Sequence, residues 1–172
     1  LDPCMGSGHI LVYAFDVLME IYRTQGYTDR DAVSAIVENN LYGLDIDDRA
    51  AQLAYFALMM KACEHDRRFL RRGVQPHVCA ITEWSGSQTD EPAWSDTERR
   101  AAHMLRETFR DAKEFGSILS IPKPLADALD ALGENPFGGE TALGVDAENL
   151  QRLAAQAKIM ARKYDVVVTN PP

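Results

Sequence analysis

The sequence predicts an α/β protein in which short parallel strands alternate with amphipathic helices, with a helical insertion before the last strand. Three observations predict this class. Apolar runs at residues 41–44, 77–81 and 164–169 have the length of buried strands. Helical apolar patterns separate the first two runs, and a longer helical stretch separates the second from the third. The composition, 46% hydrophobic and 26% charged over 172 residues, is that of a globular chain.

Two helices come first. Apolar residues at three- and four-residue steps predict an amphipathic helix over residues 9–24, which Gly26 is expected to stop. The recurring positions are Ile10, Tyr13, Ala14, Val17, Leu18 and Ile21. Thr28 then caps a second, shorter helix, whose apolar side carries Ala32, Val33, Ile36 and Val37.

Two buried strands flank a third helix. The first apolar run ends in Asp45 and is typical of a buried parallel strand. Asp47 or Asp48 is expected to cap a helix that continues to roughly Cys63. The second apolar run follows that helix and completes the β-α-β alternation.

Beyond Trp84 the chain changes to loops and helices. Helical patterns lie near residues 96–114, 124–132 and 147–163, and the stretch from Gly133 to Gly144 is expected to be mobile. We therefore divide the chain into three parts, which are residues 1–84, a mostly helical insertion at 85–163, and the last strand at 164–172.

Charge and cysteine usage exclude several classes of protein. A formal charge of −8 argues against a chain that binds nucleic acid through the electrostatic attraction of its overall charge. The cluster of Arg67, Arg68, Arg71 and Arg72 is typical of a solvated helix end. The apolar runs are too short to span a bilayer and no signal pattern opens the chain, so we expect a cytoplasmic protein without a membrane partner. Its three cysteines lack paired spacing, so neither a disulfide framework nor a metal site is predicted.

A glycine loop precedes the first helix. It contains Asp2, Pro3, Gly6 and Gly8, and it lets a ligand approach both the backbone and the unpaired N–H groups of a helix N-terminus. Such a turn also serves as a tight connection without any ligand.

Asp45 follows the first predicted strand, where open α/β sheets place a carboxylate that accepts hydrogen bonds from a ribose. The alternative is a helix-capping role, for which Asp47 and Asp48 are better placed. We expect the Asp45 carboxylate to contribute little to the stability of the cofactor-free protein. The long interval from Gly8 and the missing third glycine argue against a nicotinamide cofactor.

Asn170, Pro171 and Pro172 end the last predicted strand. Two prolines remove two backbone donors, which leaves carbonyl oxygens and a neutral amide as acceptors. Such a site suits an amino group whose nitrogen lone pair has to stay available, and it needs no charged base. The alternative is a strand and loop that the prolines merely terminate.

In this order, three motifs carry a resemblance: Asp2-Pro3-Cys4-Met5-Gly6-Ser7-Gly8, Gly43-Leu44-Asp45-Ile46, and Asp165-Val166-Val167-Val168-Thr169-Asn170-Pro171-Pro172. Together they resemble the N6-adenine DNA methyltransferases of bacterial restriction-modification and phage-exclusion systems. Phe115-Gly116-Ser117-Ile118-Leu119 is similar to the BREX-type phage-exclusion branch. The resemblance covers both ends of the chain and implies half of a Rossmann-like methyltransferase sheet.

The resemblance also implies roles for individual residues. Asp2, Pro3, Gly6 and Gly8 would line the methionine moiety of S-adenosyl-L-methionine, Asp45 would bind its ribose, and Ile46 would pack on its adenine. Asn170, Pro171 and Pro172 would hold the target amine of a base flipped out of double-stranded DNA. Glu83 would accept a hydrogen bond from the adenine amine of the cofactor, although the Thr82-Glu83-Trp84 register departs from the family pattern.

Both ends of the chain depart from the family. The catalytic tetrapeptide normally ends in an aromatic residue, and only Leu1 stands before Asp2 where a central strand is usual. We therefore expect a segment of a larger enzyme that contacts DNA through regions absent here and is inactive alone. Two alternatives stay open. A protein glutamine methyltransferase would use the same Asn-Pro-Pro chemistry, and a non-catalytic helical interaction module would keep the motifs without activity.

Overall fold

The computed structural model describes residues 1–86, 94–133, 137 and 145–171. The chain divides into two compact units, of which the first comprises Leu1–Ala80 with Tyr164–Pro172 and the second comprises Ile81–Lys163. The stretch that the sequence predicts to be mobile falls mostly on residues 134–136 and 138–144, outside the described residues.

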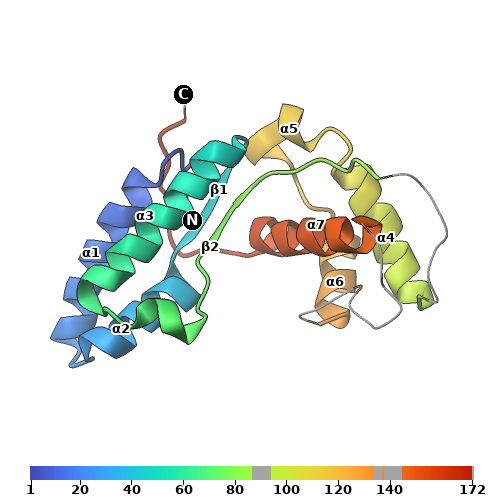
Figure 1. Ribbon diagram of the computed structural model, residues 1–172. Coiled ribbons are helices and arrows are strands. Elements are labelled where there is room, and N and C mark those ends of the chain that lie inside the picture. The colour runs from blue at the N-terminus through green and yellow to red at the C-terminus, as the bar shows by residue number, and fades with distance from the viewer. Residues whose placement is uncertain (87–93, 134–136, 138–144, 172) are drawn as a thin grey trace. The chain divides into compact units, whose positions relative to one another are not determined.

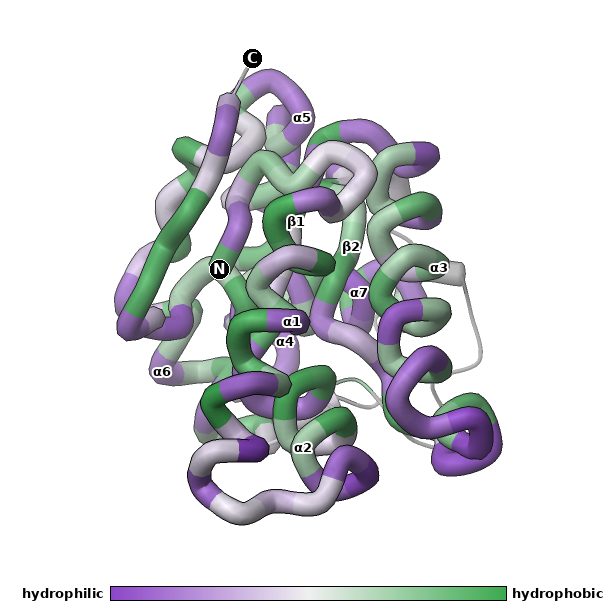
Figure 2. The backbone as a smooth tube through the Cα atoms, turned by 90° about the vertical axis from the view of Figure 1, so that its left-hand side faces the viewer, coloured by the Kyte–Doolittle hydropathy of each residue, from purple (hydrophilic) through white to green (hydrophobic). Residues whose placement is uncertain are grey.

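Two parallel strands form the sheet of the first unit. β1 (Tyr42–Asp45) and β2 (His77–Ala80) pair so that Tyr42 lies opposite His77 and Asp45 opposite Ala80. Figure 2 shows the two strands side by side, with β2 drawn mostly in the green of hydrophobic residues. Both predicted strands are thereby confirmed, as is the mixed α/β class.

The N-terminal residues extend this sheet beyond β1. Asp2 N donates to Tyr42 O and Leu44 N donates to Asp2 O, each at 2.9 Å, which pairs Asp2 with Gly43 in a parallel bridge. On its other side, Leu1 N donates to Val166 O at 2.9 Å and Val168 N donates to Leu1 O at 3.0 Å. Leu1 and Asp2 therefore lie between β1 and the C-terminal segment.

The C-terminal segment corrects one prediction. The sequence predicts a strand over residues 164–169, but no regular strand forms there. The reason is the shortage of partners, since only the two bonds to Leu1 pair this segment with the sheet in the described chain. Val166, Val167 and Val168 are accordingly 64%, 57% and 50% exposed.

Two helices of the first unit begin directly after the capping residues that the sequence predicts. α1 (His9–Thr24) and α3 (Asp48–His65) lie side by side in Figure 1 and contact each other. The Thr28 hydroxyl caps α2 (Asp29–Ala35), and the Asp47 carboxylate caps α3 through Arg49 N at 2.8 Å. Two short helices complete the unit, the π-helix η1 (Ile36–Asn40) and the 3₁₀-helix η2 (Phe69–Arg72).

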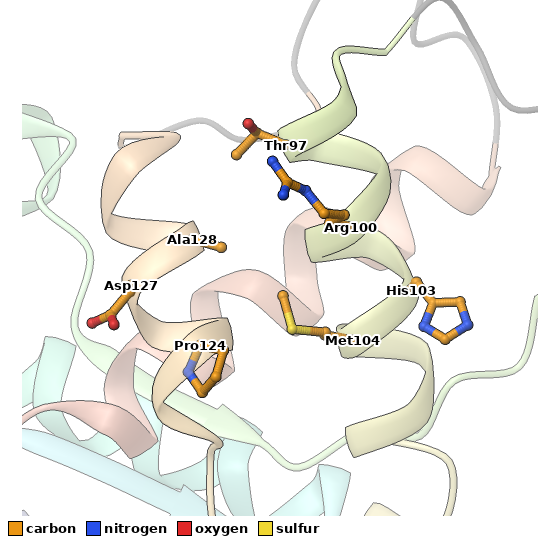
Figure 3. A pocket seen from close by; sticks show the side chains of 7 residues that line it. All are labelled: Thr97, Arg100, His103, Met104, Pro124, Asp127 and Ala128. Carbon is orange, nitrogen blue, oxygen red and sulfur yellow. The ribbon is translucent and has the colours of Figure 1, made fainter.

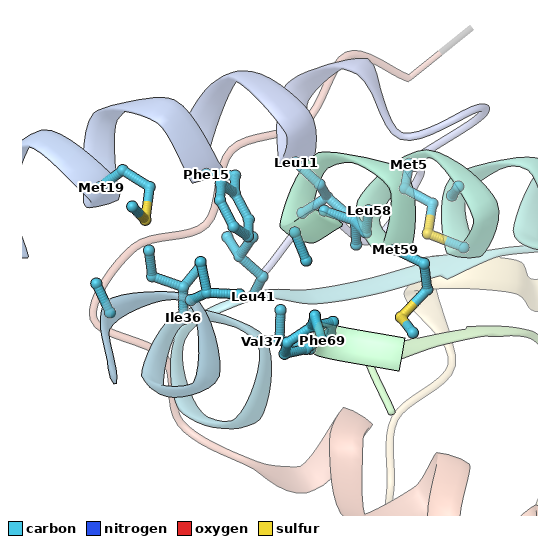
Figure 4. Close-up of a cluster of buried hydrophobic side chains, with 14 of the residues drawn as sticks. Met5, Leu11, Phe15, Met19, Ile36, Val37, Leu41, Leu58, Met59 and Phe69 are labelled. Carbon is cyan, nitrogen blue, oxygen red and sulfur yellow. The ribbon is translucent and has the colours of Figure 1, made fainter. Parts of the chain in front are cut away.

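The buried face of α1 differs from the stripe that the sequence singled out. Leu11, Phe15 and Met19 are at most 3% exposed and pack in the core that Figure 4 draws. Tyr13 and Val17, by contrast, are 73% and 41% exposed. Both stripes have helical spacing, so periodicity alone does not choose between them. Each fully buried large side chain contributes about 1.5–3 kcal/mol, which favours the face that fits the core.

The second unit is helical. It comprises α4 (Asp96–Thr108), α5 (Ala112–Phe115), the 3₁₀-helix η3 (Gly116–Ile118), α6 (Lys123–Ala131) and α7 (Val145–Ala161). Ser95 and Glu98 form a capping box at the start of α4. The predicted helical patterns are confirmed here. Through the described part of the chain, no helix combines the length and the apolar character that a bilayer crossing requires.

Candidate functional site

The glycine loop between Asp2 and α1 has a conformation that its glycines make possible. Gly6 and Gly8 have φ values of 53° and 84°, in the left-handed region that side chains rarely adopt. A Cβ atom on Gly8 would also lie 2.9 Å from the Cβ of Ala54. Gly8 therefore allows the loop to lie directly against α3.

Asp2 is a buried carboxylate with one oxygen left unpaired. The side chain is 1% exposed, and its Oδ1 accepts a hydrogen bond from Cys4 N at 3.1 Å. Its Oδ2 is buried and has no hydrogen-bond partner among the described residues. Leaving such an acceptor unsatisfied costs about 1–3 kcal/mol, so a ligand that brings a donor or a positive charge here would be stabilised.

Asp45 ends β1 and holds two turns at once. Its Oδ2 accepts a hydrogen bond from Gly6 N at 2.8 Å, and its Oδ1 accepts one from Asp47 N at 2.9 Å. Asp47, not Asp45, caps α3. The sequence pattern predicted neither of the Asp45 hydrogen bonds. Each carboxylate oxygen accepts more than one hydrogen bond, so both retain capacity for a ligand.

Ile46 follows Asp45 and presents an apolar side chain to solvent. It is 52% exposed, although β1 immediately before it is almost wholly buried. An exposed isoleucine beside a carboxylate provides an apolar contact next to a polar one, which is the pairing that a nucleoside requires.

Asn170 and Pro171 follow the segment that pairs with Leu1, and both are exposed. The two Leu1 hydrogen bonds have the alternation of parallel pairing. The glycine loop, Asp45 and Asn170 thus follow the carboxyl ends of three neighbouring parallel segments, where open α/β sheets bind ligands. Pro172 lies outside the described residues.

Glu83 belongs to the second unit and accepts a hydrogen bond within it. Its Oε1 accepts a hydrogen bond from Lys113 N at 3.0 Å. Trp84 N donates to Phe109 O at 2.9 Å, and the Arg106 guanidinium lies 5.1 Å from the centroid of the Trp84 ring. The helices of the second unit therefore fix this segment.

Gln156 on α7 is a residue that the sequence motifs did not single out. It is 1% exposed, its Oε1 accepts from Thr82 N at 3.1 Å, and its Nε2 donates to Thr82 Oγ1 at 2.8 Å. The sequence did contain a signal for this residue, because it places a glutamine among the apolar residues Leu153, Ala154 and Ala157. A polar side chain on a buried apolar helix face usually has a hydrogen-bond partner.

The described residues also form a hollow away from the predicted site residues. A hollow of about 540 Å³ between α4 and α6 is shown in Figure 3. Met104, Pro124 and Ala128 make its wall largely apolar, and none of the predicted site residues lines it. Over the ranges that the structure describes, no group of three or more histidine, cysteine or acidic side chains is arranged to hold a metal.

Comparison with known proteins identifies the family. The family model described as Eco57I restriction-modification methylase matches residues 39–172, which is most of the chain. The chain belongs to the Eco57I restriction-modification methylase family. The resemblance read from the three motifs is thereby confirmed.

Curated relatives of this methylase family are much longer than the chain. It is 38% identical to the adenine-specific methyltransferase BrxX of Escherichia coli O9:H4 (strain HS) and 37% identical to the adenine-specific methyltransferase PglX of Lacticaseibacillus casei (strain Zhang). Both matches cover 100% of the chain, which spans 17% and 15% of those proteins. A putative type II restriction enzyme and methyltransferase of Methanocaldococcus jannaschii is 39% identical over 42% of the chain and 7% of its own length.

Proposed function

We propose that the full-length protein transfers the methyl group of S-adenosyl-L-methionine to the N6 amino group of adenine in double-stranded DNA. One observation carries the proposal: Leu1 and Asp2 bridge β1 to the segment that ends in Asn170. This bridging brings the glycine loop, Asp45 and the Asn-Pro motif to one edge of the first unit. The adenine-specific names of two relatives support the choice of substrate.

The order of the segments supports a Rossmann-like sheet. From one edge to the other it is β2, β1, the Leu1–Asp2 pair and residues 166–168. The Leu1–Asp2 segment is thus internal, with β1 and β2 on one side and residues 166–168 on the other, as in the middle of a doubly wound sheet. The ligand site of such a sheet lies beside the first segment at the carboxyl ends, where the glycine loop is found.

The residues fit the proposed cofactor. The unpaired Oδ2 of Asp2 is an acceptor for the positively charged methionine end, next to the backbone of the glycine loop. Asp45 would accept from the ribose hydroxyls, and Ile46 would contact the adenine ring. For Glu83, the role of acceptor for the adenine amine stays a prediction from the resemblance, because Glu83 belongs to the second unit, where its Oε1 accepts from Lys113 N. S-adenosyl-L-methionine, when bound, supplies an electrophilic methyl group.

Asn170 and Pro171 account for the activation of the target amine. The Asn170 side-chain oxygen and the Pro171 carbonyl oxygen would each accept one N–H of the amine. These hydrogen bonds would orient the nitrogen lone pair toward the methyl group instead of the aromatic ring. The nitrogen–methyl bond would form as the sulfur–methyl bond breaks, which releases S-adenosylhomocysteine, and the surplus proton of the amine would pass to solvent. No charged base is required, so catalysis rests on positioning and on preorganised acceptors.

The test is methyl transfer by the full-length protein with isotopically labelled cofactor. Duplex DNA containing adenine should become labelled, and nucleoside analysis should recover N6-methyladenine. In the Asn170→Ala variant turnover should fall by about 10²–10³-fold, because one preorganised hydrogen-bonding group at the reacting centre is lost. Cofactor affinity should stay close to that of the wild type.

Asn39→Ala serves as the matched control, because Asn39 is an exposed asparagine at the end of η1. It should keep wild-type turnover. Wild-type turnover in Asn170→Ala would contradict the mechanism. Label in protein substrates instead of DNA would indicate a glutamine methyltransferase, and absence of cofactor binding would indicate a module without catalysis.

A further inference from the structure

We propose that Asp45 is a positioning residue for the glycine loop as well as a ligand of the ribose. Its carboxylate would then shape the part of the site that takes the methionine end of the cofactor. The inference rests on the proposed function for the identity of the cofactor. It goes beyond that function because it gives one side chain influence over both ends of the ligand.

The geometry places Asp45 at the junction of two turns. Gly6 lies in the turn before α1 and Asp47 in the turn before α3, and their N–H groups donate to different oxygens of the same carboxylate. These bonds are 2.8 and 2.9 Å long, typical of charge-assisted hydrogen bonds. Asp45 is half-buried, so bulk water screens these bonds only in part.

The loop is held by hydrogen bonds at Gly6 and by packing at Gly8. No atom lies within 4 Å of the position that a Cβ on Gly6 would take. At Gly8, by contrast, the side chain of Ala54 lies against the loop. Met5 N donates to Leu44 O at 2.9 Å, so the Asp45 bond is the next restraint along the loop. Without the carboxylate, the Gly6 N–H loses its acceptor and the backbone there is free to move.

The loop and the ribose are therefore coupled through one side chain. A role confined to the ribose predicts that removing Asp45 affects only ligands with ribose hydroxyls. A positioning role predicts weaker binding of ligands that lack them too, because the loop backbone then departs from its bound arrangement.

The first arm of the test needs no ligand. Hydrogen–deuterium exchange is measured on the full-length protein, in peptides that cover residues 4–9. Asp45→Ala should speed exchange of the loop amides by about tenfold or more, as expected when a charge-assisted hydrogen bond is lost. Asp47→Ala is the matched control. Asp47 accepts its side-chain bond from Arg49 N and none from the loop, so this variant should leave loop exchange unchanged.

The second arm measures binding by calorimetry with S-adenosylhomocysteine and with its analogue that lacks both ribose hydroxyls. Asp45→Ala should weaken the analogue by about tenfold and S-adenosylhomocysteine by more, because only the latter also loses its ribose contacts. Asp45→Asn retains one acceptor oxygen and should change both readouts less and in the same direction. This milder variant decides the question if Asp45→Ala fails to fold.

Unchanged loop exchange in Asp45→Ala would overturn the positioning role, as would unchanged affinity for the analogue. Failure of the proposed function has a different signature. If the wild type binds neither probe, the cofactor assignment fails, and the exchange arm alone then decides whether Asp45 positions the loop.

Discussion

Asp2 and Asp45 have the same side chain, but their surroundings give them different tasks. Asp2 is 1% exposed and has one unpaired oxygen, whereas Asp45 is half-buried and binds two backbone N–H groups. The two hydrogen bonds of Asp45 join the turns before α1 and α3, which the position of this residue in the sequence does not reveal. Under the proposed function, one carboxylate at a strand end would serve both the fold and the ligand.

Gly8 offers a prediction about close packing. In Gly8→Ala the new methyl group would meet Ala54, and the left-handed backbone would be strained. Gly26 has the same φ of 84° with open space around it, so Gly26→Ala isolates the backbone strain. Gly26→Ala should lower the free energy of unfolding by about 1–2 kcal/mol, and Gly8→Ala by about 1–3 kcal/mol more. Denaturant unfolding of both variants measures the difference, and equal losses would exclude the contact with α3.

At the scale of elements, burial in the sheet and pairing between helices decide what each segment becomes. β1 and β2 form as predicted because each has a parallel partner. Residues 166–168 pair with the sheet through two backbone hydrogen bonds to Leu1, and no regular strand forms there. Burial inside a strand or helix also changes the pKa and the hydrogen bonding of individual side chains. In β2, burial shifts the pKa of the Cys79 thiol. On α7, the buried Gln156 amide forms hydrogen bonds through both its oxygen and its nitrogen.

Burial raises the pKa of the Cys79 thiol from 9.0 to about 11. The unfolded chain therefore ionises this thiol at lower pH than the folded chain does. Stability is retained below about pH 9 and lost as the pH rises toward about 11, because the unfolded state then binds fewer protons. Wild type should lose about 2 kcal/mol more than Cys79→Ala between about pH 8 and pH 11. Denaturant titrations across this range measure it, and parallel curves for the two proteins would contradict the shift.

Gln156 gives a prediction for the helical unit. Gln156→Met keeps the size of the side chain but leaves Thr82 N and its hydroxyl without their partner. The free energy of unfolding should fall by about 1–3 kcal/mol. Gln52→Met makes the same chemical change at an exposed position within α3, and it should cost less. Thermal denaturation compares the two variants, and an equal or larger loss in Gln52→Met would contradict the stabilising role of the Gln156 amide.

At the scale of the whole molecule, net charge sets what the chain binds by itself. The formal charge is −8, so duplex DNA meets overall repulsion. Part of the basic cluster at η2 is neutralised within the fold, because Arg72 pairs with Asp66 and also donates to Ser34. In the relatives, whose lengths exceed that of this chain several-fold, most of the protein lies outside the matched region.

The 172-residue chain should therefore bind duplex DNA only weakly, with a dissociation constant above about 10⁻⁴ M at physiological salt. The full-length protein should bind at least about tenfold more tightly, because the proposed function requires a DNA-binding surface that this acidic chain does not supply. Fluorescence anisotropy with labelled duplex measures both. Micromolar binding by the chain alone would show that its local basic groups outweigh its net charge.

The sequence by itself determined the order of the helices and of β1 and β2, and the Thr28 and Asp47 caps, because periodicity and capping are local. Tertiary structure decided which stripe of α1 is buried and whether residues 164–169 become a strand, because both depend on partners distant along the chain. It also decided that Asp45 binds Gly6 and that Gln156 binds Thr82. These residues are 39 and 74 positions apart, beyond the reach of any local pattern.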